Sequence, residues 1–397
     1  MRRLLVLLYV LIFVDEIALL AIIPLVPSYS EEFGLSSFED GLILSSASFA
    51  IVFGSIPAGL LGDRFGLRCV TLAGVILLIV SCVGQAVAVD LWTLLGARLT
   101  FGVASSIIWS AGIAWLADSA GEGRPGALGL IVTVAGVAGT LGLVYAGGLA
   151  DLAGRAAPFA LVAVAASIVL VLLWRAGPGI ERTHERVPVR RLAGVPGLHP
   201  LIAGAVTIMM IGGFSDGVVN LLAPSQLDDA GQSATSIGLI LSASMAVFFI
   251  ASLLTARRGA SVVRFDIAAG LAFSLAVVMI PVLLPGTVAL VATMLLLRAA
   301  VLGVMYAIAF PLGISGARRA TIGGGTVNGI LGLAWGGSNF LGAFTAGAVV
   351  DVVGEQTVYA VLAALSAAAG IRLVTLMARG DESPAAAAAV SRIVRRR

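Results

Sequence analysis

Five ionisable residues lie inside long apolar runs of this sequence, where a charge is costly to maintain. They are Asp15, Glu16, Arg98, Asp216 and Arg298. A charged side chain near the centre of a lipid bilayer costs about 2.5–3.5 kcal/mol on insertion scales, and such residues commonly mark an ion or substrate pathway. The chemistry open to the three carboxylates is proton binding, because burial disfavours their charged form.

Asp15 and Glu16 are the candidates for proton binding, with Arg98 modulating release of the proton. Neighbouring residues of a helix point about 100° apart, so these two carboxylates cannot face the same point. The alternative is a structural role, in which Asp15 or Glu16 pairs with Arg98, and Asp216 pairs with Arg298, to hold helices together.

Polar and aromatic side chains in the same runs are candidates for lining a cavity or contacting a substrate. Besides Asp216 and Arg298, they are Trp109, Tyr145, Asn220, Gln226, Tyr306, Asn328, Trp335 and Asn339. The amides can equally join helices by hydrogen bonds, and the aromatic rings can simply pack.

The composition indicates that lipid, not water, surrounds these residues. Of 397 residues, 59% are hydrophobic and 11% are charged, and mean hydropathy is +1.09. A soluble domain has about 25% charged residues. Two cysteines and two histidines provide neither a disulfide framework nor a metal site. No nucleotide-binding or metalloprotease motif is present. We therefore expect no enzyme activity, no cofactor and no nucleic-acid partner.

Twelve runs are long and apolar enough to cross a bilayer as helices, which predicts an all-α membrane protein. The runs are 4–27, 39–61, 69–89, 91–117, 125–149, 157–175, 200–224, 235–256, 265–285, 287–315, 321–350 and 355–378. The first run follows two arginines, as a signal peptide does. It contains Asp15 and Glu16, however, and no small-residue cleavage site follows, so we expect a retained span.

The longest hydrophilic stretch divides the chain into equal halves. The predicted organisation is 1–175, a six-helix half; 176–199, a cytoplasmic loop; 200–378, a second six-helix half; and 379–397, a basic cytoplasmic tail. Arginines gather in loops on one side of the predicted spans and acidic residues on the other, which places both termini in the cytoplasm by the positive-inside rule. We expect a multi-pass protein of the inner (plasma) membrane.

The two halves repeat each other at offsets of 197 to 201 residues. The segment Gly41–Ser45 recurs as Gly238–Ser242, Asp15 matches Asp216, Arg98 matches Arg298, and the D-x-x-G of Asp151 recurs at Asp351. A duplicated helical unit is typical of transporters that rock two pseudo-symmetric bundles about a central site. Since one chain then forms a complete pathway, we expect a functional monomer.

Glycines at close spacing predict tight helix packing or a sliding interface between the halves. One group lies in the fifth run, at Gly136, Gly139, Gly142, Gly147 and Gly148. Other small residues lie four positions apart in the second and eleventh helices. They are Gly54, Ala58 and Gly62 in the second, and the pairs Gly325–Gly329 and Gly332–Gly336 in the eleventh.

The loop after the second run carries a motif that resembles the signature G-x-L-A-D-R-x-G-R-R of the major facilitator superfamily. It reads GLLGDRFGLR, with Gly59, Asp63, Arg64, Gly66 and Arg68 matching and Leu67 replacing the first closing arginine. The resemblance covers nearly the whole chain. It implies that these residues, with Asp118, form a cytoplasmic charge latch in the outward-facing state. The R-x-x-x-G of Arg98 and Gly102 also resembles a family motif linked to proton coupling.

Within that superfamily, VDEIALLAIIPLVPSY and GGLADLAGRAAPF resemble the twelve-helix drug:proton antiporters. The chain departs from their G-P-x-x-G-G motif, because Leu143 and Val144 precede Tyr-Ala-Gly147-Gly148. The resemblance implies proton-coupled efflux of a hydrophobic or amphipathic compound, with the solute, protons and the lipid bilayer as partners. The alternative is a sugar or organic-acid transporter, and the charge of the cavity should separate the two.

Overall fold

The computed structural model describes residues 2–120, 124–176, 199–258, 264–280, 287–320 and 324–381, and the regular structure in these ranges is entirely helical. The central polar loop, residues 177–198, and the basic tail from residue 382 lie outside the described residues, so the predictions made for them stay predictions.

The first half of the chain forms the helices up to residue 176. They are α1 (Arg2–Ala21), η1 (Ile23–Leu25), α2 (Val26–Phe33), α3 (Ser37–Phe65), α4 (Leu67–Ala86), α5 (Leu91–Ile107), η2 (Ile108–Gly112), α6 (Ile113–Ala120), α7 (Arg124–Ala153) and α8 (Ala156–Ala176). Two irregular turns, η1 and η2, interrupt helices of this half. A 3-10 turn at Pro24 separates α1 from α2, and a π-helical turn, η2, separates α5 from α6.

The second half forms six helices. They are α9 (Pro200–Asp229), α10 (Ala234–Arg257), α11 (Phe265–Val278), α12 (Val288–Arg319), α13 (Gly324–Val353) and α14 (Glu355–Asp381). Over the described residues, each predicted run overlaps one of these helices or a helix pair joined by an irregular turn.

Within the described ranges, ten helical segments are long and apolar enough to cross a membrane. The helix α11 is shorter, with 14 described residues, and α13 does not meet the same criterion. The chain is therefore a multi-pass helical protein, and the number of twelve spans stays a prediction.

Capping groups and left-handed glycines define several of the helix ends. Asp90 accepts hydrogen bonds from the Thr93 N–H (2.8 Å) and from the Thr93 hydroxyl (2.9 Å) at the start of α5. Both bonds lower the pKa of Asp90. Gly34, Gly154 and Gly354 end their helices with φ near +64°, +83° and +79°, a region that favours glycine.

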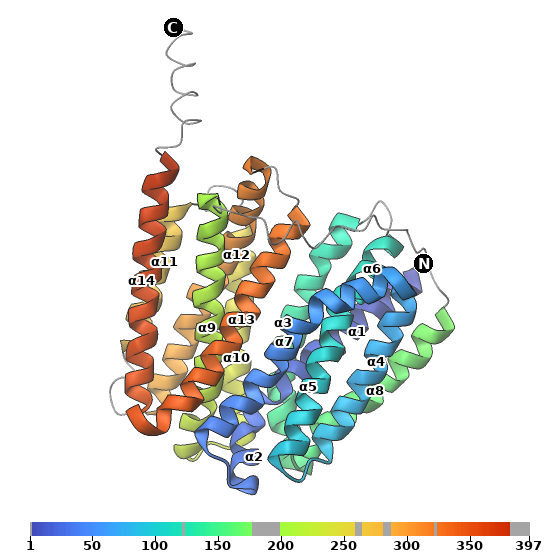
Figure 1. Ribbon diagram of the computed structural model, residues 1–397. Helices are drawn as coiled ribbons and strands as arrows, with labels where there is room; N and C mark the ends of the chain where they lie inside the picture. The colour runs from blue at the N-terminus through green and yellow to red at the C-terminus, as the bar shows by residue number, and fades with distance from the viewer. Residues whose placement is uncertain are drawn as a thin grey trace, which may run out of the picture.

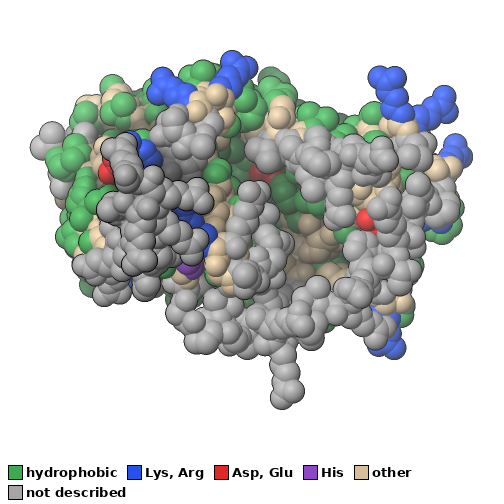
Figure 2. Space-filling view, turned by 90° about the horizontal axis from the view of Figure 1, so that it is seen from above, with side chains coloured by type: hydrophobic (Ala, Val, Ile, Leu, Met, Phe, Trp, Pro, Cys, Tyr) green, Lys and Arg blue, Asp and Glu red, His purple; other side chains and the backbone are tan. Residues whose placement is uncertain are grey.

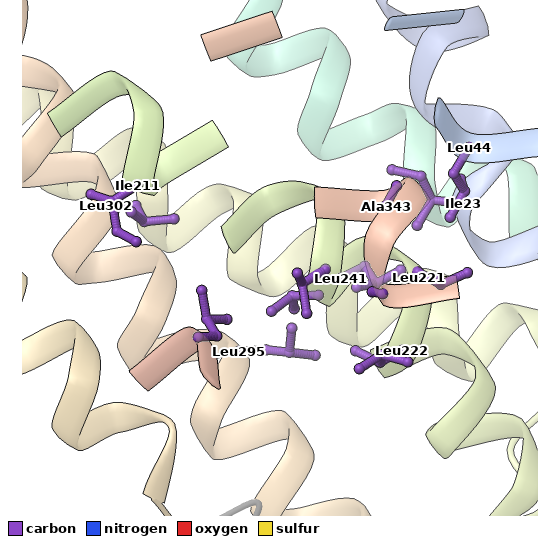
Figure 3. Close-up of a cluster of buried hydrophobic side chains, with 14 of the residues drawn as sticks. Ile23, Leu44, Ile211, Leu221, Leu222, Leu241, Leu295, Leu302 and Ala343 are labelled. Carbon is purple, nitrogen blue, oxygen red and sulfur yellow. The ribbon is translucent and has the colours of Figure 1, made fainter. Parts of the chain in front are cut away.

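The two halves meet along two helix pairs, α3 with α13 and α7 with α10. Figure 1 shows the helices from residue 200 onward on the left, most of the earlier helices on the right, and these four between them. Buried apolar side chains from both halves join here, as Figure 3 shows for Ile23 and Leu44 near Ala343. This junction contains the cavity described next.

Candidate functional site

A cavity of about 380 Å³ lies between the two halves of the chain. Its walls come from α1, α3, α5, α7, α9, α10, α12 and α13, and most of the lining side chains are apolar. Figure 2 views the end of the molecule where the N-terminus lies, with arginines around its rim and a recess between the halves. Four charged residues line the cavity: Glu16, Arg98, Asp216 and Arg298. Their formal charges balance.

Asp216 is held by three donors in the second half. Arg298 forms an ion pair with its Oδ1, while Tyr306 Oη (2.9 Å) and Trp335 Nε1 (3.1 Å) donate to its Oδ2. Arg298 also donates through Nε to Ser215 Oγ (2.8 Å). These contacts join α9, α12 and α13 and neutralise the carboxylate, as the structural alternative predicted for this pair.

Among the described residues, no cation is paired with Asp15. Its side chain is fully buried, and Oδ2 accepts hydrogen bonds from Ser105 Oγ (2.9 Å) and Trp109 Nε1 (2.9 Å). Its Oδ1 has no hydrogen-bond partner among the described residues. The two donors come from α5 and from the π-helical turn η2, which carries Trp109.

Arg98 does not form the ion pair that one alternative predicted. Its side chain is 2% exposed, and Nε and Nη1 have no hydrogen-bond partner in the described ranges. The guanidinium lies over the Phe101 ring, 5.3 Å from its centroid. The repeat thus places an arginine and an aspartate at equivalent positions in both halves, but only the second half joins them.

Glu16 faces the cavity, next to Leu19 and Leu20 of the same helix, whereas Asp15 does not line it. Helix geometry accounts for this difference, since adjacent side chains diverge by about 100°. The first half therefore contains two carboxylates in different surroundings, one enclosed and one facing the cavity.

Several other predicted residues also meet at the cavity. Trp109, Asn220, Tyr306, Trp335 and Asn339 line it. Asn339 Oδ1 accepts a hydrogen bond from Ser48 Oγ (2.8 Å), which links α13 to α3 across the junction.

Two other candidates do not line the cavity. Tyr145 donates to the Pro158 carbonyl (2.7 Å), and Gln226 bonds to Glu355 and Tyr359, so both join helices instead of lining the cavity. The side chain of Asn328 lies outside the described residues.

The motif between α3 and α4 forms a tight turn at one end of the first half. Gly66 adopts φ +87°, which favours glycine, and Arg68 Nη2 donates to the Trp174 carbonyl at the end of α8 (2.9 Å). Arg64 is exposed, Asp118 is buried, and the Asp63 side chain lies outside the described residues. This bond of Arg68 lies within the first half, and the cytoplasmic charge latch that the resemblance implies stays a prediction.

The predicted packing glycines differ in their surroundings. A Cβ at Gly142 would lie 3.2 Å from the Ile17 Cα, one at Gly139 would lie 2.7 Å from Met245 Cε, and one at Gly147 would collide with the Ala234 carbonyl. At Gly148 the nearest atom would be Thr235 Oγ1, at 3.9 Å. In α13, Gly329 and Gly332 have no described atom within 4 Å of such a Cβ, so close packing does not extend along the whole predicted stripe.

The sequence reasoning missed Ser105, which donates to Asp15, and Ser215, which accepts from Arg298. Serines in apolar helices commonly bond back to their own helix, so their type gave no signal. The π-helical turn η2 was also missed. Such turns are frequent at functional sites, but the local sequence IWSAG gives no evident warning.

The fold and the buried charges define a multi-pass membrane protein with a central cavity between two repeated halves. The chain belongs to the Major Facilitator Superfamily, a family of membrane transporters whose family model matches residues 5–211. The superfamily predicted from the motifs is thereby confirmed, while the drug:proton antiporter group stays a prediction.

Curated relatives are similar over part of the chain. A "Probable vesicular acetylcholine transporter-B" of Danio rerio is 28% identical over 225 residues, covering 53% of this chain and 45% of the relative. A "Probable sugar efflux transporter" of Helicobacter pylori (strain P12) is 26% identical over 196 residues, covering 48% and 49%. The chain thus spans about half the length of these relatives.

A solved structure is similar over nearly the whole chain. It is a bacterial homolog of the human lysosomal transporter Spinster, in an inward-facing and occupied conformation, with a TM-score of 0.71, 16% identity and 94% coverage of both chains. At this identity the likeness shows the fold.

Proposed function

We propose that this protein is a secondary transporter of the inner membrane, with cytoplasmic termini, that exports a small hydrophobic or amphipathic compound in exchange for protons. The two halves alternate access to the cavity between them. The observation that carries the proposal is the contrast between the carboxylates: Asp216 has an arginine and two further donors, whereas Asp15 has two neutral donors and no cation.

This contrast supports proton exchange in the first half. A carboxylate paired with a cation keeps its charge, whereas one buried without a cation is destabilised in its charged form. Asp15 and Glu16 therefore load and release the proton. Arg98, whose Nε and Nη1 have no hydrogen-bond partner among the described residues, modulates release of the proton. Protonation removes the charge that Ser105 and Trp109 bind and so weakens the link from α1 to α5 and η2.

The apolar cavity wall supports a hydrophobic or amphipathic solute. Phe248, Phe249 and Met245 line it together with many aliphatic side chains. Such a wall has few groups that could bind a polyhydroxylated solute, which needs several hydrogen-bond partners.

The test is accumulation of ethidium and a panel of amphipathic compounds in efflux-deficient bacteria. Cells with the parent protein should accumulate less than empty-vector cells, and an uncoupler should abolish the difference. Asp15→Asn combined with Glu16→Gln should raise accumulation to the empty-vector level, because no proton is then exchanged. Asp266→Asn, at an exposed carboxylate paired with Arg264, is the matched control and should behave like the parent.

Unchanged efflux and unchanged uncoupler sensitivity in the double variant, with protein present in the membrane, would exclude these carboxylates as the proton site. No effect of the parent protein on any compound would contradict amphipathic efflux.

A second candidate is transport of a sugar or organic acid by the same fold. Arg98 favours the organic acid, because a buried guanidinium with unbonded nitrogens that lines a cavity suits a carboxylate ligand. Metabolite profiling of the medium then decides. An acid that is exported by the parent and not by Arg98→Gln would establish this candidate. The formal charges that line the cavity balance, so they favour neither an anionic nor a cationic solute.

A further inference from the structure

Two aspartates close the face of the molecule opposite the recess, which we call the far face. It contains the α2–α3, α7–α8, α9–α10 and α13–α14 connections. Asp151, in the last turn of α7, accepts a hydrogen bond from the backbone N–H of Thr235 in the first turn of α10 (2.8 Å). Asp351, in the last turn of α13, accepts one from the hydroxyl of Ser37, the first residue of α3.

Each contact joins one half of the chain to the other, and the two contacts are reciprocal. Asp151 of the first half meets a helix start in the second, and Asp351 of the second half meets a helix start in the first. The aspartates are 200 residues apart, and the helix starts at Ser37 and Thr235 are 198 residues apart. The internal repeat therefore produces the contact twice, related by the pseudo-twofold of the duplication.

The chemistry of both contacts is favourable for a carboxylate. The first N–H groups of a helix have no partner within it, and the N-terminus has a partial positive charge. A carboxylate placed there gains a hydrogen bond and a charge–dipole attraction. A neutral amide would keep only the former.

Glycines allow the backbones to approach at both contacts. A Cβ at Gly147 would collide with the Ala234 carbonyl, and one at Gly238 would lie 2.5 Å from the Leu143 carbonyl. In the other contact, a Cβ at Gly41 would lie 2.7 Å from the Ala343 carbonyl, and one at Gly347 would lie 2.6 Å from the Ser37 carbonyl. Each aspartate thus sits one turn beyond a glycine, Gly147 or Gly347, that lies against the backbone of the other half.

The other end of α3 and α13 lacks this fit. Gly59 in α3 and Gly329 in α13 have no described atom within 4 Å of a hypothetical Cβ. These two helices are therefore in close contact at the far face and less closely packed toward the recess.

We propose that Asp151 and Asp351 are the positioning residues of two latches that hold the far face closed in this state. Both carboxylates are exposed at the surface, so water can replace the helix N-terminus as their partner when the halves rock. The latches then open without leaving a buried unsatisfied group, which suits a contact that is remade in every cycle. This role rests on the proposed alternation of access, but it is independent of the proton site.

The experiment measures the distance between the halves at the far face. Spin labels are attached at Val89→Cys and Gln356→Cys, two exposed positions, one in each half, in a Cys69→Ser, Cys82→Ser background. We expect the parent in detergent or nanodiscs to show mainly a short distance. Asp151→Ala with Asp351→Ala should add a longer one. For hydrogen bonds to a charged group at an exposed site, about a fivefold rise in the open-to-closed ratio is expected per latch.

Asp90→Ala is the matched control, because Asp90 caps the start of α5 within a single half. It should lower thermal stability and leave the distances unchanged. Ser37→Ala removes the donor of the second latch without touching an acid, and it should shift the distances in the same direction as Asp351→Ala.

The proposal is overturned if both aspartate variants fold and lose stability, as Asp90→Ala does, with the distance distribution of the parent. It is also overturned if Ser37→Ala and Asp351→Ala have no common effect. Since neither a proton gradient nor a solute enters the measurement, failure of proton coupling would leave these outcomes unaffected.

Discussion

At the residue scale, equivalent positions in the two halves have acquired different chemistry. Asp15 and Asp216, with Arg98 and Arg298, occupy matching places in the repeat. Only the second half forms the ion pair, where Ser215, Tyr306 and Trp335 complete the binding of both partners. In the first half, Trp109 and Ser105 satisfy one oxygen of the aspartate and leave the arginine apart. A duplicated site has thus become one fixed pair and one pair of separate charges.

This difference gives a testable prediction for the second half. Arg298→Met leaves the partly buried Asp216 without its cation. Removal of one partner from a fully buried ion pair costs about 3–5 kcal/mol, so we expect a loss at or below the lower end of that range. Asp216→Asn combined with Arg298→Met removes both charges and should recover most of that loss. Thermal unfolding in detergent of the parent, both single variants and the double variant measures the coupling.

The corresponding cycle with Asp15→Asn and Arg98→Met is the internal comparison. Because the two groups do not contact each other, their effects should be nearly additive. A coupling as large as that of Asp216 and Arg298 would contradict the separation seen here.

At the element scale, glycines determine how closely the backbones of neighbouring helices can approach each other. Gly102 of α5 is the last residue of the R-x-x-x-G motif, and a Cβ there would collide with the Ala47 carbonyl of α3 and lie 2.6 Å from Ala50 Cβ. The motif's glycine therefore permits contact between α5 and α3, and that contact places Arg98, one turn earlier in α5, beside the cavity.

Gly102→Val should accordingly destabilise the protein by about 1–3 kcal/mol, the usual cost of overpacking. Gly96 lies in the same helix with no described atom within 4 Å of a Cβ, so Gly96→Ala is the matched control. It should be neutral or stabilising by up to about 1 kcal/mol, because alanine favours helix over glycine. Equal changes of thermal stability in the two variants would contradict close helix approach as the reason for glycine at position 102.

At the scale of the whole molecule, the arrangement of helices follows from apolar runs and the internal repeat. Within lipid every backbone group must be satisfied inside its own segment, so long apolar runs can only be helices. The repeat of Gly41–Ser45 at Gly238–Ser242 anticipated that α3 and α10 are equivalent, and both contribute to the junction between the halves. The motif around Gly66 predicted the turn between α3 and α4.

What the sequence could not supply is side-chain geometry across long separations. Ser105 and Trp109 meet Asp15 from 90 and 94 positions away, through a π-helical turn that no residue pattern announces. Gln226 looked like a cavity residue because it is polar in an apolar helix. Its partners Glu355 and Tyr359 come from α14, and only the packing of α9 against α14 could show this.

Orientation in the membrane is a prediction for the whole molecule, and a natural cysteine tests it. Cys69 is exposed at the start of α4, near the arginine-rich turn, while Cys82 is buried. With cytoplasmic termini, a membrane-impermeant maleimide should label Cys69 in inside-out vesicles and not in intact cells. Cys69→Ser should lose the label. Val89→Cys in that background lies just beyond the opposite end of α4, so the maleimide should label it in intact cells and not in inside-out vesicles.

The neutralised pair of Asp216 and Arg298 has an electrical consequence. Moving one elementary charge across a membrane potential changes the free energy by about 2.3 kcal/mol per 100 mV. A carboxylate and a guanidinium in contact carry no net charge. Movement of this pair as the halves rock therefore transfers no net charge through the field. The voltage then acts through Asp15, Glu16 and Arg98 and through any charge on the solute. Export of a neutral compound against one proton is therefore electrogenic, and export of a monovalent cation against one proton is not.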